Sequence, residues 1–173
     1  MLFNRDNYSF QWKDIGDIAL GRPQMGEETS VAVYRMMQYS MRSVLNTEMG
    51  SERAAKLFYR AGFLAGEQFF TNRLKNGQPL NLFVAELQQQ LLELGICILR
   101  VEDADIEKLK FTLVVAEDLD CSGLPVSGET VCDYDEGFIA GIFEAYTGKA
   151  FEVKEIDCWS NGSRVCRFSV NVR

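Results

Sequence analysis

Apolar residues recur at helical spacing through the first half of the chain. The first stripe predicts a helix over residues 26–45, and Gly50 ends this segment. That stripe consists of Val33, Met37, Met41 and Val44. A second helix is predicted over residues 51–74, and a third stripe ends at Gly95. The third stripe consists of Phe83, Leu87, Leu91 and Leu94. We therefore expect a helical N-terminal half.

The pattern changes after Gly95 to short segments rich in branched and aromatic residues, which are typical of strands. Four such segments are predicted, at 96–102, 107–117, 151–159 and 165–172. The first two join at the turn 103–105, and the last two join at Asn161-Gly162, a dipeptide typical of hairpins. A helix over 132–147 separates the two strand pairs. This order predicts an α+β fold in which the helical half packs on an antiparallel sheet.

Residues 1–24 follow a different pattern from the rest of the chain. Tyr8, Phe10 and Trp12 alternate with polar neighbours, which predicts a half-buried strand in an N-terminal arm or edge hairpin. Residues 25–173 show no internal repeat and have the length of one domain. We therefore expect an arm followed by a single domain.

Two glycines stand four residues apart in the second predicted helix. Gly62 and Gly66 are flanked by Ala61 and Ala65, so they clear a flat strip on which another backbone can approach closely. Each glycine costs about 1 kcal/mol relative to alanine within a helix, so a compensating contact is expected. We predict close packing against a neighbouring helix or sheet, and a ligand lying on the strip is the alternative.

The composition is that of an ordinary globular domain, with 47% hydrophobic and 25% charged residues among 173. No apolar run is long enough to span a bilayer, and the first residues do not resemble a signal peptide. A cytoplasmic protein without a membrane span is therefore expected.

Acidic residues are concentrated in one part of a chain whose net charge is −7. Eleven acids and two bases lie between Glu102 and Glu136. This excess argues against direct binding to nucleic acid or to an anionic membrane. We expect a solvated acidic face, since the spacing of the acids does not fit a calcium-binding loop.

The absence of histidine narrows the possible chemistry. It excludes the serine and cysteine nucleophile pairs that need histidine and the histidine-based zinc motif of metalloproteases. Glycine-rich phosphate-binding motifs are also missing from the sequence. The chain is therefore expected not to be an enzyme, unless it uses less common chemistry.

The chain contains five cysteines, and an odd number without a signal peptide predicts reduced thiols. Cys97 stands between two isoleucines, a pattern typical of a small apolar filler in a strand. Cys121 lies in a loop. Cys132 opens a predicted helix, whereas Cys158 and Cys166 flank one hairpin.

The geometry of that hairpin decides what its cysteines can do. A three-residue loop sets Cys158 opposite Cys166, whereas a two-residue loop staggers them. The first register allows either a disulfide or a metal site that also uses Cys132. Glu155 is a candidate fourth ligand, but a regular strand turns it to the other face, so its ligation requires a bulge.

Other interpretations of this hairpin remain open at this point. Cys121 or Asp133 could replace Glu155 as the fourth ligand. Reduced cysteines without a metal are a further alternative.

These residues resemble the C-terminal signature of the 4-vinyl reductase-type domain. The resemblance lies in Cys132, the run from Glu155 to Cys158, the run from Cys166 to Phe168, and the preceding stretch from Gly137 to Gly141. It extends to Tyr34-Arg35 and the glycine-spaced second helix. This family includes aromatic-sensing domains of transcription activators, an accessory protein of bacteriochlorophyll vinyl reduction and archaeal hydrocarbon-binding proteins. It shares its α+β fold with the vesicle-tethering TRAPP subunits, which commonly dimerise through their helices.

The resemblance implies a site and a pocket. By analogy with the zinc-containing sensors, one structural zinc ion would be held by Cys132, Glu155, Cys158 and Cys166. A closed site of this kind is not catalytic. A ligand pocket between helices and sheet is expected to be lined by Phe83, Phe111, Phe138 and Val153.

The resulting hypothesis is a zinc-stabilised domain that binds a small hydrophobic or aromatic ligand. It would act as a sensor or carrier through a homodimer and a separate effector protein. The alternatives are an enzyme or accessory protein of tetrapyrrole vinyl reduction, and a scaffold like the tethering subunits that binds no ligand. The lack of histidine argues against phenol itself as the ligand, since a phenol sensor of this family uses histidine for the hydroxyl group.

Overall fold

The structure is a computed structural model and describes residues 8–173. The chain divides into two compact units, Met1–Ala54 and Ala55–Arg173. Helix α3 (Ser51–Arg73) begins just before the boundary and belongs mainly to the second unit. The expected arm over 1–24 and single domain over 25–173 stay a prediction.

The first unit contains short helical segments and one long helix. These are the 3-10 helix η1 (Trp12–Ile15), α1 (Ile18–Gly21) and α2 (Val31–Met49). The hydroxyl of Ser30 accepts a hydrogen bond from the backbone N–H of Ala32 at 3.2 Å and caps α2. The helix therefore begins five residues after the predicted start at residue 26, because the cap and not the acidic stretch sets its first turn.

The predicted strand around Tyr8, Phe10 and Trp12 is wrong where it falls on described residues. Residues 8–11 form no strand, and Trp12 opens η1. The carboxylate of Asp14 accepts a hydrogen bond from the N–H of Gln11 at 2.8 Å, which favours a tight turn over an extended chain. Residues 1–7 of the predicted arm lie outside the described part of the chain.

The apolar stripe of α2 is exposed. Its members Val33, Met37, Met41 and Val44 are each at least half exposed, whereas Gln38 on the same helix is buried. The helical spacing of the stripe is thus confirmed, but the stripe is not part of the described core.

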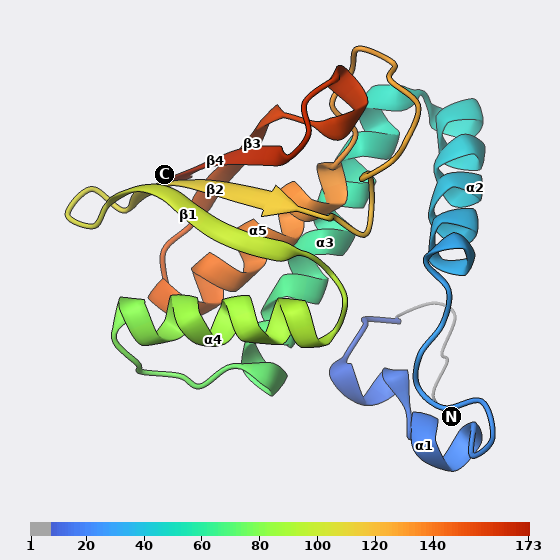
Figure 1. Cartoon of the computed structure of the whole chain (residues 1–173), viewed down its shortest axis with the longest axis horizontal. Coiled ribbons are helices and arrows are strands. Elements are labelled where there is room, and N and C mark those ends of the chain that lie inside the picture. Colours follow the sequence, from blue (N-terminus) through green and yellow to red (C-terminus); the bar gives the residue numbers. More distant parts are fainter. Residues whose placement is uncertain (1–7) are drawn as a thin grey trace. The chain divides into compact units, whose positions relative to one another are not determined.

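The second unit is built on a four-stranded antiparallel sheet (Figure 1). Its strands are β1 (Ile98–Asp105), β2 (Lys110–Ala116), β3 (Phe151–Asp157) and β4 (Cys166–Val172). They lie in the order β1-β2-β4-β3. The α+β fold with an antiparallel sheet is therefore confirmed.

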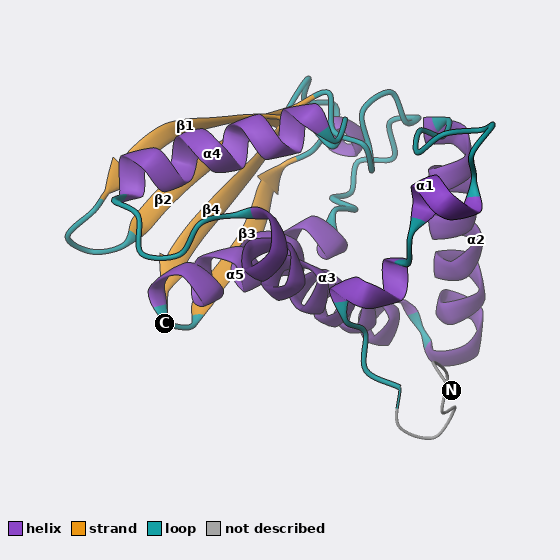
Figure 2. Ribbon diagram, turned by 90° about the horizontal axis from the view of Figure 1, so that it is seen from below, coloured by secondary structure: helices purple, strands orange, loops and turns teal. Residues whose placement is uncertain are grey.

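Two helices cover one face of this sheet (Figure 2). Helix α4 (Leu80–Glu93) contacts β1, and helix α5 (Asp133–Thr147) contacts β3. Alternate residues of β3 are buried beneath α5, as a half-covered strand requires. On the other face, the Arg167 side chain forms ion pairs with Glu102 and Asp157.

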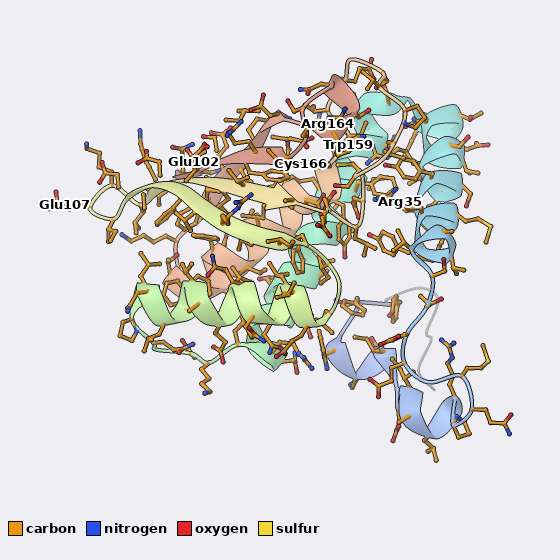
Figure 3. The ribbon with its side chains drawn as sticks, viewed as in Figure 1. Arg35, Glu102, Glu107, Trp159, Arg164 and Cys166 are labelled. Carbon is orange, nitrogen blue, oxygen red and sulfur yellow. The ribbon has the colours of Figure 1, made fainter. Side chains whose placement is uncertain are left out.

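Two connections differ from the predicted turns. The β1–β2 turn lies at residues 106–109 instead of 103–105, because the Asp105 carboxylate accepts a hydrogen bond from the N–H of Lys108 at 3.0 Å. Figure 3 shows Glu107 at the tip of this hairpin. The β3–β4 connection is not a two-residue turn but contains the 3-10 helix η2 (Trp159–Asn161), and Gly162 ends it with a φ of 104°.

The predicted close packing at Gly62 and Gly66 is confirmed, and its partner is α5. A Cβ atom added to Gly62 would lie 2.0 Å from the carbonyl oxygen of Tyr134, and one on Gly66 would lie 2.2 Å from that of Phe138. Gly137 and Gly141 of α5 face the carbonyl oxygens of Tyr59 and Phe63 in the same way, at 1.9 and 2.2 Å. Helices α3 and α5 therefore touch backbone to backbone.

Aromatic side chains fill the core between the helices and the sheet. Phe83 of α4 stacks on Tyr146 of α5 with ring centroids 3.9 Å apart. Phe143 meets Phe83 edge to face, and it also contacts Phe111 and Phe151 of the sheet. The Tyr146 hydroxyl donates a hydrogen bond to the carbonyl of Gln78 at 2.8 Å. These contacts fix α4 and α5 relative to the sheet.

Within residues 8–173, no helix is both long enough and apolar enough to cross a membrane.

Candidate functional site

Four of the five cysteines meet in one buried group, although they come from four separate segments. Cys121 lies in the loop after β2, Cys132 precedes α5, and Cys158 follows β3. Cys166 opens β4 (Figure 3). Their sulfur atoms all lie within 4.8 Å of one another, and all four side chains are buried. We call this group the cysteine cluster.

The spacing around Cys132 fits a tetrahedral thiolate site. Its Sγ atom lies 3.8 Å from Sγ of Cys158 and 3.9 Å from Sγ of Cys166. Zinc–sulfur bonds of about 2.3 Å place two ligands of a tetrahedron about 3.8 Å apart. The Sγ atoms of Cys121 and Cys166 are 3.0 Å apart and would have to separate by about 0.8 Å to reach that spacing. The cluster could therefore hold a metal ion after a small adjustment.

A β-bulge in β3 decides which side chains reach the cluster. Glu155 pairs with Phe168, but Asp157 pairs with Arg167, so the register shifts by one residue between them. The shift puts Glu155 and Cys158 on the same buried face, which a regular strand would prevent. The same register sets Cys158 opposite Cys166.

Glu155 lies beside the cluster and is itself buried. Its Oε2 atom accepts a hydrogen bond from the N–H of Cys132 at 3.1 Å, whereas its Oε1 atom is buried without a hydrogen-bond partner among the described residues. Burial raises the pKa of this carboxyl to about 8, against the opposing effect of the hydrogen bond to Cys132. The backbone N–H of Glu155 donates to Oε1 of Glu136 at 2.8 Å.

The structure thus brings three of the predicted metal ligands, Cys132, Cys158 and Cys166, into contact with Cys121. Glu155 contacts the backbone of Cys132, and its free Oε1 leaves it available as a ligand. Asp133 is not part of the group of atoms that could share an ion. Sequence reasoning placed Cys121 only in a loop, because an irregular segment carries no periodicity from which its position can be read.

The thiols of the cluster influence one another's ionisation. Hydrogen bonds to Cys121, Cys158 and Cys166, together with burial, raise the pKa of Cys132. The same kind of contact from Cys121, Cys132 and Cys166 stabilises a thiolate at Cys158 and lowers its pKa. The geometry therefore favours one negative charge shared among four sulfur atoms, and a cation is needed before further thiols can ionise together.

Several acids of the charged segment lie inside the protein, so the expected solvated face is wrong for them. Asp118, Asp120 and Glu136 are between 3% and 6% exposed. The carboxylate of Asp118 accepts a hydrogen bond from the N–H of Cys121 at 2.9 Å, and burial raises its pKa to about 6. Oε1 of Glu136 pairs with the Lys154 ammonium at 2.8 Å. These acids hold backbone groups and side chains next to the cluster.

An apolar pocket lies beside the cluster, between α4, α5 and the strands β1 and β2. It contains about 440 Å³ of empty space, counting the part that is open to solvent. Its walls include Leu87 and Leu91 of α4, Leu113 and Val115 of β2, and Ile139 and Ile142 of α5. Such a volume, lined mainly by apolar side chains, is typical of small-molecule sites.

The four residues expected to line a pocket lie in two places. Phe138 lines the pocket. Phe83, Phe111 and Val153 are buried in the surrounding core and do not line it. A ligand-binding role for these residues stays a prediction.

The loop that carries Cys121 is held against the β3–β4 connection. The indole N–H of Trp159 donates to the carbonyl of Leu124 at 3.1 Å, and the Arg164 guanidinium lies 5.0 Å from the centre of the Trp159 ring (Figure 3). The backbone N–H groups of Ser127 and Gly128 both donate to the carbonyl of Ser160. Trp159 therefore covers the hairpin and does not line the pocket.

Comparison with protein families identifies the C-terminal part of the chain. Residues 111–172 match the V-4-R domain, the domain of the vinyl-4-reductase family, and they include all four residues of the cysteine cluster and Glu155. The resemblance to the 4-vinyl reductase-type domain is therefore confirmed.

Two proteins of Methanocaldococcus jannaschii, both uncharacterized, resemble most of the chain. One is 25% identical over 150 residues, which cover 86% of this chain and 81% of the relative. The other is 23% identical over 163 residues, which cover 92% of this chain and 87% of the relative.

Solved structures share the fold at lower sequence identity. The phenol-responsive sensory domain of the transcription activator PoxR, determined with phenol, matches with a TM-score of 0.67 and 20% identity, over 85% of this chain and 76% of that chain. A vinyl-4-reductase family protein from Methanocaldococcus jannaschii matches with a TM-score of 0.62 and 16% identity, over 96% and 99%. A trafficking protein particle complex subunit 3 from Naegleria fowleri, covalently bound to palmitic acid, matches with 0.65 and 12%, over 83% and 95%. The expected TRAPP-subunit-like fold is confirmed.

Proposed function

We propose that this protein, in which residues 111–172 form a vinyl-4-reductase-type domain, binds a small hydrophobic or aromatic molecule and acts as a sensor or carrier through a partner. The observation that carries this proposal is the apolar pocket between α4, α5 and the sheet. It occurs in a fold shared with the phenol-responsive sensory domain of PoxR. The pocket is large enough for a single aromatic ring with a short substituent.

Binding of such ligands is expected to raise the melting temperature. A ligand present at 100 times its Kd adds about 2.7 kcal/mol of stability, which for a chain of this size corresponds to a shift of roughly 5–10 °C. Differential scanning calorimetry with a panel of small aromatic and aliphatic compounds measures the shift. The variant Ile139→Trp fills the pocket and is expected to abolish it.

The matched control is Ile156→Trp, because Ile156 is half exposed and does not line the pocket. This variant is expected to keep the shift. If no compound in the panel stabilises the wild-type protein, the ligand-binding proposal is wrong and a scaffold without ligand is favoured. A shift that persists in Ile139→Trp would place the ligand elsewhere.

We further propose that the cysteine cluster holds one structural zinc ion. Cys132, Cys158 and Cys166 belong to the set implied by the family resemblance, and Cys121 supplies a fourth sulfur atom. With four protein ligands the ion would be closed to substrate and would contribute stability instead of catalysis. It would join the start of α5, the β3–β4 hairpin and the loop after β2.

The fourth ligand is Cys121 in this proposal and Glu155 in its alternative. The four sulfur atoms already lie together, and Oε2 of Glu155 already accepts a hydrogen bond from Cys132. We therefore expect Cys121→Ser to weaken zinc binding at least tenfold, whereas Glu155→Gln keeps one zinc ion per chain. Elemental mass spectrometry and competition with a chelator measure both quantities. The opposite result would assign Glu155 as the ligand and Cys121 as a neighbour.

The proposal includes a homodimer and a separate effector protein. The exposed apolar stripe of α2, defined by Val33, Met37, Met41 and Val44, supports a second copy as its partner. Light scattering gives the mass in solution, and a monomer at micromolar concentration would contradict the dimer.

A further inference from the structure

The apolar pocket has a polar end. All of its lining residues are hydrophobic except Cys97, Asp118 and Asp135, and neither lysine nor arginine is among them. Asp118 follows β2, and Asp135 lies in the first turn of α5, so the two carboxyl groups come from opposite walls. They lie close enough to each other to share an ion with Cys132, since the three ligand atoms are within 4.8 Å of one another.

One oxygen at this end of the pocket has unused hydrogen-bonding capacity. The Oδ2 atom of Asp135 is buried and has no hydrogen-bond partner among the described residues. Buried polar atoms are nearly always paired, because an unpaired one loses its hydration without compensation. The first turn of α5 favours a negative charge at Asp135, but it does not supply the missing donor.

The surroundings determine which donor suits this oxygen. Asp118 and Asp120 are buried nearby, and their charges act on Asp135 together with those of Glu155 and Cys166. An anionic group that entered the pocket would be repelled, and a neutral group would leave the negative potential uncompensated. A positively charged donor forms stronger hydrogen bonds with a carboxylate than a neutral donor does.

We infer that the ligand of this pocket is a hydrophobic amine, whose ammonium group binds Asp135 and Asp118 and whose apolar body lies between α4, α5 and the sheet. The inference rests on the proposed ligand-binding function and specifies its chemical class. It separates this pocket from one suited to a fatty acid, whose carboxylate would meet the two aspartates.

A series of compounds with one common ring tests the charge of the ligand directly. Benzylamine, benzyl alcohol, toluene and benzoate differ mainly in the group attached to the ring. Titration calorimetry on the wild-type, full-length protein is expected to show benzylamine binding at least tenfold more tightly than benzyl alcohol or toluene. Benzoate is expected to bind most weakly of the four.

Two variants locate the ammonium group. Asp135→Asn is expected to reduce the preference for benzylamine over benzyl alcohol to less than threefold, with the affinity for toluene unchanged. Glu129→Gln removes one negative charge from an exposed residue that does not line the pocket, so it is expected to keep the full preference. Zinc content and melting temperature of each variant show whether the fold is intact.

The outcomes separate this inference from the proposed function. If none of the four compounds binds, the ligand-binding function itself is contradicted. If toluene and benzyl alcohol bind as tightly as benzylamine, the function stands and the amine inference is wrong. The wild-type series decides this question even if Asp135→Asn fails to fold. Competition of benzylamine binding by zinc beyond one ion per chain would instead assign the two aspartates to a second metal ion and overturn the inference.

Discussion

Removal of the metal by a strong chelator is expected to lower the melting temperature by at least 10 °C. The four cysteine side chains come from four segments, and the segment around Cys121 has no regular secondary structure of its own. Structural zinc contributes about 10–16 kcal/mol in small zinc-dependent peptides. Because this chain also has an aromatic core, we expect a smaller loss, of about 3–5 kcal/mol.

The substitution Cys158→Ser should have the same effect as the chelator and make the chelator ineffective. The matched control is Cys97→Ser, since Cys97 is buried but does not belong to the cluster. This control is expected to keep one zinc ion per chain and its sensitivity to the chelator. Calorimetry and elemental analysis of the same samples check these expectations. Wild-type protein that is folded, metal-free and fully reactive toward a thiol reagent would show that the cluster is not a metal site.

The second large effect is expected at the contact between α3 and α5. Gly62→Ala places a methyl group 2.0 Å from the carbonyl oxygen of Tyr134, so the two helices must move apart. Alanine gains about 1 kcal/mol over glycine in helix propensity, but overpacking against a fixed backbone costs more than that. We expect a net loss of about 2–4 kcal/mol in the free energy of unfolding.

Gly141→Ala tests the same contact from the other helix and is expected to cost a similar amount, because its methyl group meets the carbonyl of Phe63. The control is Gly21→Ala in α1, where an added Cβ atom meets nothing within 4 Å and the backbone is not left-handed. This change is expected to be neutral or slightly stabilising. Urea unfolding of the three variants compares the values. Equal stabilities for all three would show that the helices can separate without cost.

The regular parts of the fold could be predicted from the sequence because they depend on local patterns. The helices around Gly62 and Phe83, and the one that ends at Gly148, follow from apolar spacing and from glycine caps. The strands after Gly95 follow from their branched residues. Even the close contact at Gly62 and Gly66 was predictable, since paired glycines in a helix need a compensating neighbour.

Features that depend on a single side chain or on tertiary packing could not be predicted. The β1–β2 turn differs from its predicted place because Asp105 caps the backbone of Lys108, and the expected strand near Trp12 is replaced by a turn held by Asp14. A charge pattern cannot show which acids are buried, so it places Asp118 and Asp120 on the surface.

The candidate site was predictable only in part. Cys132, Cys158 and Cys166 are expected from the sequence to lie together, and they do. The bulge that turns Glu155 inward is a condition for its ligation and is present in β3. Cys121 could not be placed, since its loop follows no period and is held near the cluster by hydrogen bonds to Ser160.

Helix α5 connects two sites that are distinct in their chemistry. Its first turn follows Cys132, its centre is fixed on α3 by Gly137 and Gly141, and its other side forms a wall of the pocket through Ile139 and Ile142. A molecule that displaces this wall therefore rotates the helix about a pivot at its glycines and shifts the first turn. Occupancy of the pocket and affinity for the metal are then thermodynamically linked, and each changes the other by the same factor. A domain of this design would signal through the tilt of one helix.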